Sequence, residues 1–239
     1  MSNLTNQFFD ITRLPISEGL LIFPISMSRI SNSQMGSKYF KIIESFNVKI
    51  NRATIGVSFI YTDALYSKYS FSSISSKNKY IDLMLSHKNL FMKTLRKNST
   101  YVESAFSFTT WSQLILETTN FLDLFSKIQK LYHLDKDFNN YVAEDIKRSK
   151  KTLTKNNIDF ILEEILMVYL LINEEIYIHN KFISGRDKWR LLCYLGKPNK
   201  SMIYFIQKNI LKLTCANIYN SSFYDLSEKK LYNFDNFDL

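Results

Sequence analysis

The first part of the chain holds two short apolar runs with a helical pattern between them. Leu20–Ile25 and Ile55–Tyr61 are mostly apolar, which predicts strands buried on both faces, as in a parallel sheet. Between them, Lys38–Phe46 carries apolar residues at helical spacing, and it follows the Ser- and Asn-rich stretch Ser26–Ser37. A strand, a helix and a second strand in this order predict a β-α-β unit.

The rest of the chain alternates helical patterns with further apolar runs. The polar stretch Ser67–Ser76 predicts a loop. Asn156 or Asn157 is expected to cap the helix predicted over Ile158–Ile176. Helices are predicted over Lys79–Asn98, Trp111–His133, Phe138–Lys151 and Ile158–Ile176, and strands over Tyr101–Phe108, Trp189–Leu195 and Met202–Gln207. This alternation predicts an α/β fold, a single Rossmann-like domain over residues 1–239 with a mostly parallel central sheet flanked by helices.

The composition suits a chain with a large core and a basic surface. Of the 239 residues, 46% are hydrophobic, which is enough for one large domain. The 31 Lys and Arg residues outweigh the 22 Asp and Glu residues, so the net charge is +9. A basic excess favours binding to phosphate backbones or anionic membranes, and ordinary solubility charge is the alternative explanation.

Cysteines, histidines and apolar segments narrow the class of protein. Cys193 and Cys215 form no CxxC pair and the 3 histidines are scattered, so we expect a reduced protein without a metal site. The N-terminus has no apolar signal-peptide core, and the longest apolar run, Ile165–Ile172, is too short to span a bilayer. We therefore expect a cytoplasmic protein with no membrane partner.

Several common nucleotide-binding and hydrolytic motifs are absent from the sequence. It contains no GxGxxG, P-loop, GxSxG or HExxH motif. The HIGH-type signature with which class I aminoacyl-tRNA synthetases bind ATP is also missing. We therefore expect neither ATP-dependent activation of an amino acid nor a cofactor.

Three local features carry candidate chemistry. Ser26 directly follows the first predicted strand, where parallel sheets expose catalytic groups, so it is a candidate nucleophile; alternatively it opens a loop or caps the next helix. Tyr169 and Glu174 lie in a very apolar helical segment, where a carboxylate could bind a cationic amine. Alternatively, Glu174 and Glu175 lie at a helix end and face water. Tyr194 ends a predicted strand, twenty residues after Glu174.

Together these features resemble the tRNA-dependent cyclodipeptide synthases, a family with the fold of a class I aminoacyl-tRNA synthetase catalytic domain. That family has a catalytic Ser in a G-[VI]-S-x-x-[NS] pattern, a Tyr-x-x-x-Glu pair on a late helix, and a [CA]-Tyr-[His/Gln] strand end followed by Pro. The corresponding segments here are Pro24-Ile25-Ser26, Tyr169 to Glu174, and Leu192-Cys193-Tyr194-Leu195 with Pro198.

Three positions depart from the family pattern in residue type. Pro24 replaces the usual Gly, Arg29 stands where Asn or Ser is usual, and Leu195 replaces His or Gln. The resemblance implies two side-chain pockets, the first near Pro24, Ile178 and Leu192 and the second near Ile60, Arg29 and Leu195. An Arg in the second pocket would favour an acidic or polar second amino acid.

The spacing of the Tyr and Glu pair also departs from the pattern. Tyr169 precedes Glu174 by five residues rather than four, an offset of roughly 140° on a helix. Either Asn173 takes the Glu position, or Leu170 takes the Tyr position, or a bulge restores the geometry.

The resemblance implies an enzyme that joins two amino acids, taken from two aminoacyl-tRNAs, into a diketopiperazine. Ser26 would attack the first aminoacyl ester, and an aminoacyl-enzyme and then a dipeptidyl-enzyme would form on it. Glu174 and Tyr169 would bind the α-amino group of the substrate. Tyr194 would position Ser26 or relay a proton.

Basic residues in two regions would contact the acceptor stem of the tRNA. The resemblance suggests a basic helix within Lys77–Lys97, and helical spacing predicts a second basic face near residue 150. The candidates are Lys88, Lys93, Arg96 and Lys97 in the first region and Lys147, Lys150 and Lys151 in the second. A solvated helix face is the alternative. Aminoacyl-tRNA is the expected partner, and a monomer is the family expectation.

Two other interpretations stay open. A catalytically silent relative would bind aminoacyl-tRNA without making a cyclodipeptide, and Leu195 and the Tyr169 spacing favour it. A basic α/β protein outside this family would bind RNA or a protein partner. A hydroxylamine-sensitive aminoacyl adduct on Ser26 would separate the enzyme from both, and a tRNA gel shift would separate these two from each other.

Overall fold

The strands of the chain form one twisted sheet. The computed structural model describes residues 19–31, 36–45, 55–69, 74–97, 103–172, 189–209, 211 and 221–234. The strands in these ranges are β1 (Gly19–Ile25), β2 (Ile55–Tyr61), β3 (Phe106–Thr110), β4 (Trp189–Tyr194), β5 (Ser221–Asp225) and β6 (Lys230–Asn233). Their order in the sheet is β3-β2-β1-β4-β5-β6, and every neighbouring pair is parallel except β5 and β6.

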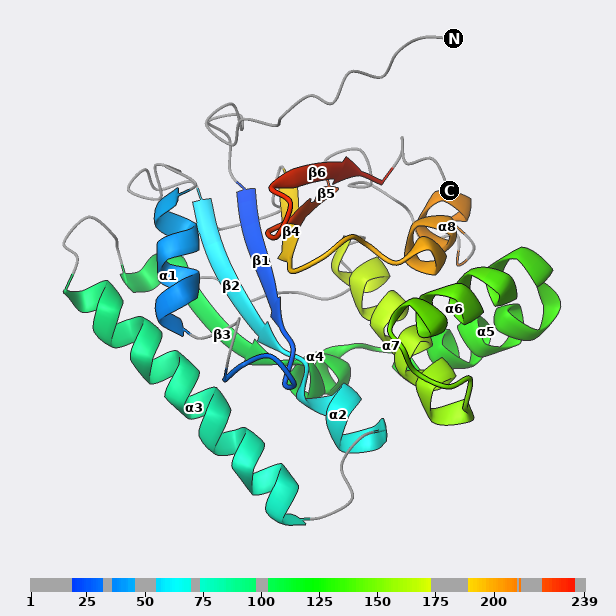
Figure 1. The fold of residues 1–239 in the computed structure, drawn as a ribbon, viewed down its shortest axis with the longest axis horizontal. Coiled ribbons are helices and arrows are strands. Elements are labelled where there is room, and N and C mark those ends of the chain that lie inside the picture. Colours follow the sequence, from blue (N-terminus) through cyan, green and yellow to red (C-terminus); the bar gives the residue numbers. More distant parts are fainter. Residues whose placement is uncertain are drawn as a thin grey trace, which may run out of the picture.

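Helices cover both faces of this sheet (Figure 1). They are α1 (Gly36–Ser45), α2 (Asp63–Tyr69), α3 (Ile74–Arg96), α4 (Trp111–Glu117), α5 (Phe121–Leu134), α6 (Lys136–Arg148), α7 (Lys155–Ile172) and α8 (Lys200–Lys208). Along β1, Leu21, Phe23 and Ile25 face the core under α1 and α3, because successive side chains alternate between faces. Leu20 and Ile22 face the second core, which the remaining helices cover.

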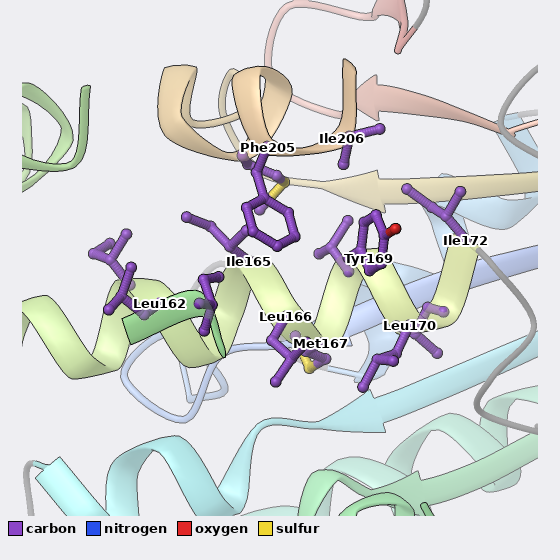
Figure 2. Close-up of a cluster of buried hydrophobic side chains, with 14 of the residues drawn as sticks. Leu162, Ile165, Leu166, Met167, Tyr169, Leu170, Ile172, Phe205 and Ile206 are labelled. Carbon is purple, nitrogen blue, oxygen red and sulfur yellow. The ribbon is translucent and has the colours of Figure 1, made fainter. Parts of the chain in front are cut away.

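Helix α7 lies at the centre of the second core. Its residues from Ile165 to Ile172 are all buried, and a helix that is apolar all round must be covered on every side. Figure 2 shows Phe205 and Ile206 of α8 against the α7 side chains. The helix is antiparallel to β4, because the Leu171 carbonyl accepts a hydrogen bond from Arg190 near the start of that strand.

The structure confirms the predicted α/β architecture with a mostly parallel sheet. The strands expected at Leu20–Ile25, Ile55–Tyr61 and Trp189–Leu195 are β1, β2 and β4. The expected strand Tyr101–Phe108 begins instead with a 3₁₀ turn over Glu103–Ala105 and continues as β3. Strands β5 and β6 were not predicted, because both are short and polar residues interrupt them.

The prediction of a strand at Met202–Gln207 is wrong. This segment lies within helix α8, whose residues from Ser201 to Ile206 are buried against α6 and α7. An apolar run buried on all sides has no periodicity that separates a helix from a strand. Here Asp145 stabilises the helix, because its carboxylate accepts the Lys200 and Ser201 backbone N–H groups at the helix start.

Two predicted helix boundaries are also wrong. The long helix expected over Trp111–His133 divides into α4 and α5, because Asn120 adopts the left-handed conformation with φ of 66°. Asn156 and Asn157 lie inside α7 rather than at its cap; Thr154 instead accepts the Asn157 backbone N–H, at 3.3 Å.

The loop expected over Ser67–Ser76 is shorter than predicted. Helix α2 continues to Tyr69 and α3 begins at Ile74. The helix predicted over Ile158–Ile176 runs to Ile172, and the residues after it lie outside the described part of the chain.

Candidate active site

The strand order reverses at β1, and such a reversal marks the expected place of a ligand-binding crevice at the carboxyl edge of the sheet. From β1 the chain moves outward to β2 and β3, and it later returns to the other side of β1 as β4. Loops on the two sides of such a switch point diverge, and open α/β sheets bind their ligands there. Ser26 follows β1 and Leu195 follows β4, so both residues lie at this crevice.

Ser26 lies in a cluster of three hydroxyl groups. Its Oγ is 2.6 Å from the Tyr66 Oη and 3.0 Å from the Ser28 Oγ, and the latter two atoms are 3.0 Å apart. The Ser26 side chain is buried, whereas Ser28 is exposed. Ser26 therefore has a phenol within proton-transfer distance and solvent on the far side of the cluster.

Backbone hydrogen bonds fix the strand ends that carry this cluster. The Thr62 backbone N–H and hydroxyl both donate to the Ile25 carbonyl, at 3.1 and 3.0 Å. The Arg29 N–H donates to the Ser26 carbonyl at 3.0 Å and closes a turn after β1. Because α2 begins directly after Thr62, this pairing brings Tyr66 to Ser26 across 40 residues of sequence.

Arg29 connects the two loops of the crevice. Its Nη1 donates to the Leu195 carbonyl at 3.0 Å, and its guanidinium carbon lies 5.9 Å from the centre of the Tyr194 ring. Burial, with a smaller contribution from the negative charge of Glu164, raises the pKa of Tyr194 far above its usual value. Tyr194 is therefore a neutral hydroxyl group at working pH.

The loop after β4 is held from below by β5. The Asp225 Oδ1 accepts the Gly196 backbone N–H at 3.0 Å, and it also accepts the Ser227 N–H at 2.8 Å. Gly196 has φ of 107°, a conformation that favours glycine. The position of Leu195 is thus set by the residues around it.

Glu164 on α7 supplies a carboxyl group to the crevice. Burial raises its pKa to about 7, and the positive charge of Lys151 opposes this shift. The Asn199 Nδ2 donates to the Glu164 Oε2 at 3.3 Å. A carboxyl group with a pKa near 7 can pair with an ammonium group as a carboxylate and can also take up a proton near neutral pH.

Phe160 lies one helical turn before Glu164. Its ring meets the Tyr66 ring edge to face at 5.5 Å, and the Lys151 ammonium group lies 4.7 Å from its centre. Phe160 and Glu164 are four residues apart, so they share one face of α7. This face, the Ser26 cluster and Tyr194 together suit acyl transfer from a substrate that carries an amine.

The structure brings some of the predicted catalytic residues together and separates one from them. Ser26 and Tyr194 both lie at the crevice, but the fully buried Tyr169 faces α8. The Tyr169 Oη donates to the Asn209 Oδ1 at 2.6 Å, and its ring packs on Phe205 (Figure 2). Glu174 and Ile178 lie outside the described residues.

Tyr66, Phe160 and Glu164 were not among the predicted site residues. A signal for two of them is present, because Phe160 and Glu164 keep the four-residue spacing that Tyr169 and Glu174 do not have. Phe160 itself has no hydroxyl group. The contact between Tyr66 and Ser26 has no such signal, since the strand pairing alone creates it.

The predicted pocket residues lie in two groups. Pro24, Ile60 and Leu192 lie on the same face of the sheet, with Pro24 beside Ile60 in register, and the latter two are fully buried in the core below the crevice. Arg29 and Leu195 lie above them, joined by the hydrogen bond described above.

Four predicted basic residues surround a hollow at the carboxyl end of α3. This basic hollow, of about 690 Å³, is lined by Lys88, Asn89, Met92, Lys93, Arg96, Lys97 and Glu103. Arg96 forms an ion pair with Glu103 at 2.8 Å, and the Lys88 Nζ lies 5.5 Å from the centre of the Phe108 ring. Lys93 and Arg96 also lie in the last helical turn, where positive charges interact favourably with the helix dipole.

The predicted basic helical face of Lys147, Lys150 and Lys151 is not formed. Helix α6 ends at Arg148, and Lys150 adopts a left-handed conformation with φ of 56°. Lys151 consequently turns toward α7, where it lies over Phe160. Among these three lysines, Lys151 is the one whose positive charge lowers the pKa of Glu164.

The described residues contain neither a candidate metal cluster nor a helix suited to span a membrane. No cluster of three or more His, Cys, Asp or Glu side chains in this part of the chain is arranged to hold a metal ion. No helix in the same ranges combines the length and apolar character of a membrane span.

Comparison with known proteins shows similarity in structure but not in sequence. No family model matches the chain, and no curated protein matches it. A cyclodipeptide synthase from Staphylococcus haemolyticus is similar with a TM-score of 0.55 and 13% identity, over 90% of this chain and 91% of the other.

Two further structures agree with this similarity. A cyclodipeptide synthase from Fluoribacter dumoffii has a TM-score of 0.52 and 14% identity, over 80% of this chain and 84% of its own. A Mycobacterium tuberculosis protein has a TM-score of 0.52 and 15% identity, over 78% of each chain, and its structure relates cyclodipeptide synthetases to type I tRNA synthetases. The chain therefore has the fold that the sequence predicted.

Proposed function

We propose that this chain is a tRNA-dependent cyclodipeptide synthase, an aminoacyltransferase that makes a diketopiperazine from two aminoacyl-tRNAs. The observation that carries the proposal is the crevice at the switch point of the sheet. There, Ser26 contacts Tyr66 at 2.6 Å, and the charge of Glu164 acts on the neutral Tyr194 hydroxyl. The fold shared with cyclodipeptide synthases supports the same conclusion.

In the first step, the Ser26 Oγ attacks the ester carbonyl of an aminoacyl-tRNA. A bond forms between Oγ and the carbonyl carbon, and the bond from that carbon to the ribose oxygen breaks. The hydroxyl proton of Ser26 passes to Tyr66, whose own proton passes to the leaving ribose oxygen. The Tyr66 hydroxyl thus ends the step as it began, and the tRNA leaves with a free hydroxyl.

Glu164 takes the role of binding the α-amino group in this proposal, in place of Glu174. Its carboxylate pairs with the ammonium form and accepts a proton when the amine becomes a nucleophile. Phe160 has no hydroxyl group, so Tyr66 replaces the phenol that the family pattern would supply from that position. Tyr169 has a packing role on α8 instead.

Two further acyl transfers complete the reaction. The α-amine of the aminoacyl-enzyme attacks the ester of a second aminoacyl-tRNA, which forms a peptide bond and releases the second tRNA. The free amine of the dipeptidyl-enzyme then attacks the Ser26 ester carbonyl. This closes the six-membered ring and returns the proton to Ser26.

Basic residues bind the tRNA partners in this proposal. Lys151 lies next to Phe160 at the crevice, where it would contact phosphate near the charged end of the tRNA. Lys88, Lys93 and Lys97 at the basic hollow would contact phosphates further along the acceptor stem. The proposed tRNA substrates imply action in the cytoplasm. A monomer without a cofactor is the family expectation.

The test is mass spectrometry of the medium from a bacterial host that expresses the chain. Wild type should release a diketopiperazine whose mass identifies both amino acids, and Ser26→Ala should release none. Ser31→Ala is the matched control, because Ser31 is exposed in the same turn, and it should keep the product. An identical product from Ser26→Ala would refute the proposal.

One observation favours a second candidate function, a relative that binds aminoacyl-tRNA without forming the product. Phe160, which takes the place of the family's Tyr in this proposal, has no hydroxyl group. This candidate predicts a tRNA gel shift that Lys151→Ala weakens, and no hydroxylamine-sensitive adduct on Ser26. An adduct on Ser26 rejects it.

A further inference from the structure

An ion pair between the partly exposed Lys68 and the buried Glu163 joins the short helix α2 to α7. The Glu163 side chain is fully buried, and the Lys68 Nζ donates to both of its oxygens, at 2.9 and 3.0 Å. Tyr69 donates its hydroxyl to Oε2 at 2.9 Å, and the Trp111 indole N–H donates to Oε1 at 3.1 Å. Each carboxylate oxygen therefore accepts two donors, and the group is fully satisfied.

The other end of α2 is fixed in the same way. Asp63 accepts hydrogen bonds from the Ser112 backbone N–H at 3.0 Å and the Ser112 hydroxyl at 2.5 Å. Helix α2 has 7 residues, which is too short to be stable in isolation. Its position is therefore set by its two anchors, on α4 at the start and on α7 at the end.

Tyr66 lies between these anchors, two residues before Lys68. Its hydroxyl must stay 2.6 Å from the Ser26 Oγ, so a small rotation of α2 would break that contact. The ion pair itself adds little net stability, because the Lys68 side chain is 42% exposed to solvent. Its hydrogen bonds are directional, however, and they fix the rotation of α2 in a way that apolar contacts do not.

We propose that Glu163 is a positioning residue for Tyr66 and thereby for the nucleophile Ser26, an inference that rests on the proposed function. Glu163 and its neighbour Glu164 have different roles in this proposal, because consecutive residues of α7 face different neighbours. Glu164 faces the crevice, whereas Glu163 faces α2 and α4 and does not touch substrate.

The first test is a double-mutant cycle on formation of the Ser26 adduct. Tyr66→Phe should slow single-turnover acylation by about 100-fold, and Glu163→Gln should slow it by about tenfold because Tyr66 is misplaced. The double variant should be no slower than Tyr66→Phe alone, since Glu163 acts through Tyr66. Affinity for aminoacyl-tRNA should stay unchanged in all three.

The second test does not need activity. Hydrogen exchange of the α2 amides should be faster in Glu163→Gln than in wild type, while exchange in β1 and α7 stays the same. Glu144→Gln, an exposed charge change on α6, is the matched control and should leave α2 unchanged. Should Glu163→Gln not fold, Tyr69→Phe removes one donor to the same carboxylate and is expected to act in the same direction.

These results separate the two proposals. A wild-type chain that forms no Ser26 adduct rejects the proposed function, and the α2 exchange rates then decide alone whether Glu163 fixes this helix. Unchanged α2 exchange, or additive effects of Glu163→Gln and Tyr66→Phe, overturns the positioning role.

Discussion

Ser26 depends on side chains that are distant from it in sequence. Tyr66 reaches it from the helix after β2, and Glu164 and Phe160 reach the same crevice from α7. None of them is reactive by residue type alone. Their proximity to one another and to Tyr194 is what the proposed acyl transfer rests on.

The raised pKa of Glu164 predicts a pH dependence of activity. If its carboxylate binds the amine, acylation should rise with pH through about 7, where this group ionises. Glu164→Gln should remove this rising limb and lower the rate at pH 8. The measurement is single-turnover acylation from about pH 5.5 to about pH 8.5; Glu144→Gln should keep the wild-type profile.

The same shift predicts the sign of a stability effect. The pKa of Glu164 is raised on folding, so between the unfolded value and about 7 the folded chain holds more protons than the unfolded chain. Stability from this group therefore falls as the pH rises through that window. Glu164→Gln should raise the melting temperature relative to wild type at pH 8 and not at pH 4, and the reverse pattern would contradict the shift.

The sequence predicted part of this site because some positions carry their own pattern. Ser26 and Tyr194 follow apolar strands, so their place at the carboxyl edge could be inferred from β1 and β4 alone. The prediction of Glu174 rested on the apolar segment around it and on its spacing to Tyr194, and this residue lies outside the described part of the chain. Distance along the chain does not reveal which turn of a buried helix faces the crevice.

At the scale of elements, prediction succeeded where burial follows a simple period. Strands β1 and β2 are apolar runs between polar segments, and both were predicted. Helix α8 has a similar run, and its start is capped by Asp145 of another helix, a contact that the local sequence does not reveal. The break at Asn120 depends on one left-handed residue, which leaves the apolar pattern on both sides unchanged.

Gly36 at the start of α1 allows close contact with α3. A Cβ atom at this position would lie 2.5 Å from the His87 carbonyl oxygen and 2.9 Å from the Phe91 nitrogen, so the helix backbones would have to separate. Gly36→Ala should destabilise the fold by about 1–3 kcal/mol, as overpacking does. Urea unfolding measures this loss, and Lys41→Ala, exposed on α1, should change stability by less than about 0.5 kcal/mol.

Asp145 predicts a second effect on an element. Its buried carboxylate accepts the Ser201 backbone N–H at 2.9 Å and the Ser201 hydroxyl at 2.6 Å at the start of α8. Asp145→Ala should cost about 2–4 kcal/mol, since it removes a cap and leaves buried donors without acceptors. Its exposed neighbour Glu144→Ala should cost less than about 1 kcal/mol in the same denaturation experiment.

At the scale of the whole molecule, the basic hollow and the candidate catalytic residues lie in different regions. The crevice lies at the carboxyl edge of the sheet, where Ser26 follows β1. The basic hollow lies around the last turns of α3, near the start of β3 (Figure 1). A ligand that uses both regions must be long and negatively charged, and a tRNA acceptor stem meets both conditions.

This distribution predicts the salt dependence of tRNA binding. A triple variant with Lys88, Lys93 and Lys97 replaced by Ala should bind aminoacyl-tRNA more weakly, and the slope of log Kd against log salt should fall by about 2–3. A triple variant at the exposed Lys127, Lys130 and Lys136 has the same net charge and is the control. Equal slopes for the two variants would show that the basic hollow does not contact phosphate.

The pairing of β1 with β4 has a consequence for how the chain folds. Gly19 pairs with Trp189, so the central contact of the sheet closes a very long loop, and such contacts form slowly. During synthesis, β1, β2 and β3 can associate early, but the crevice stays incomplete until residues beyond Tyr194 have left the ribosome. The nascent chain therefore carries Ser26 beside charged tRNAs without the partner strand that would complete the site.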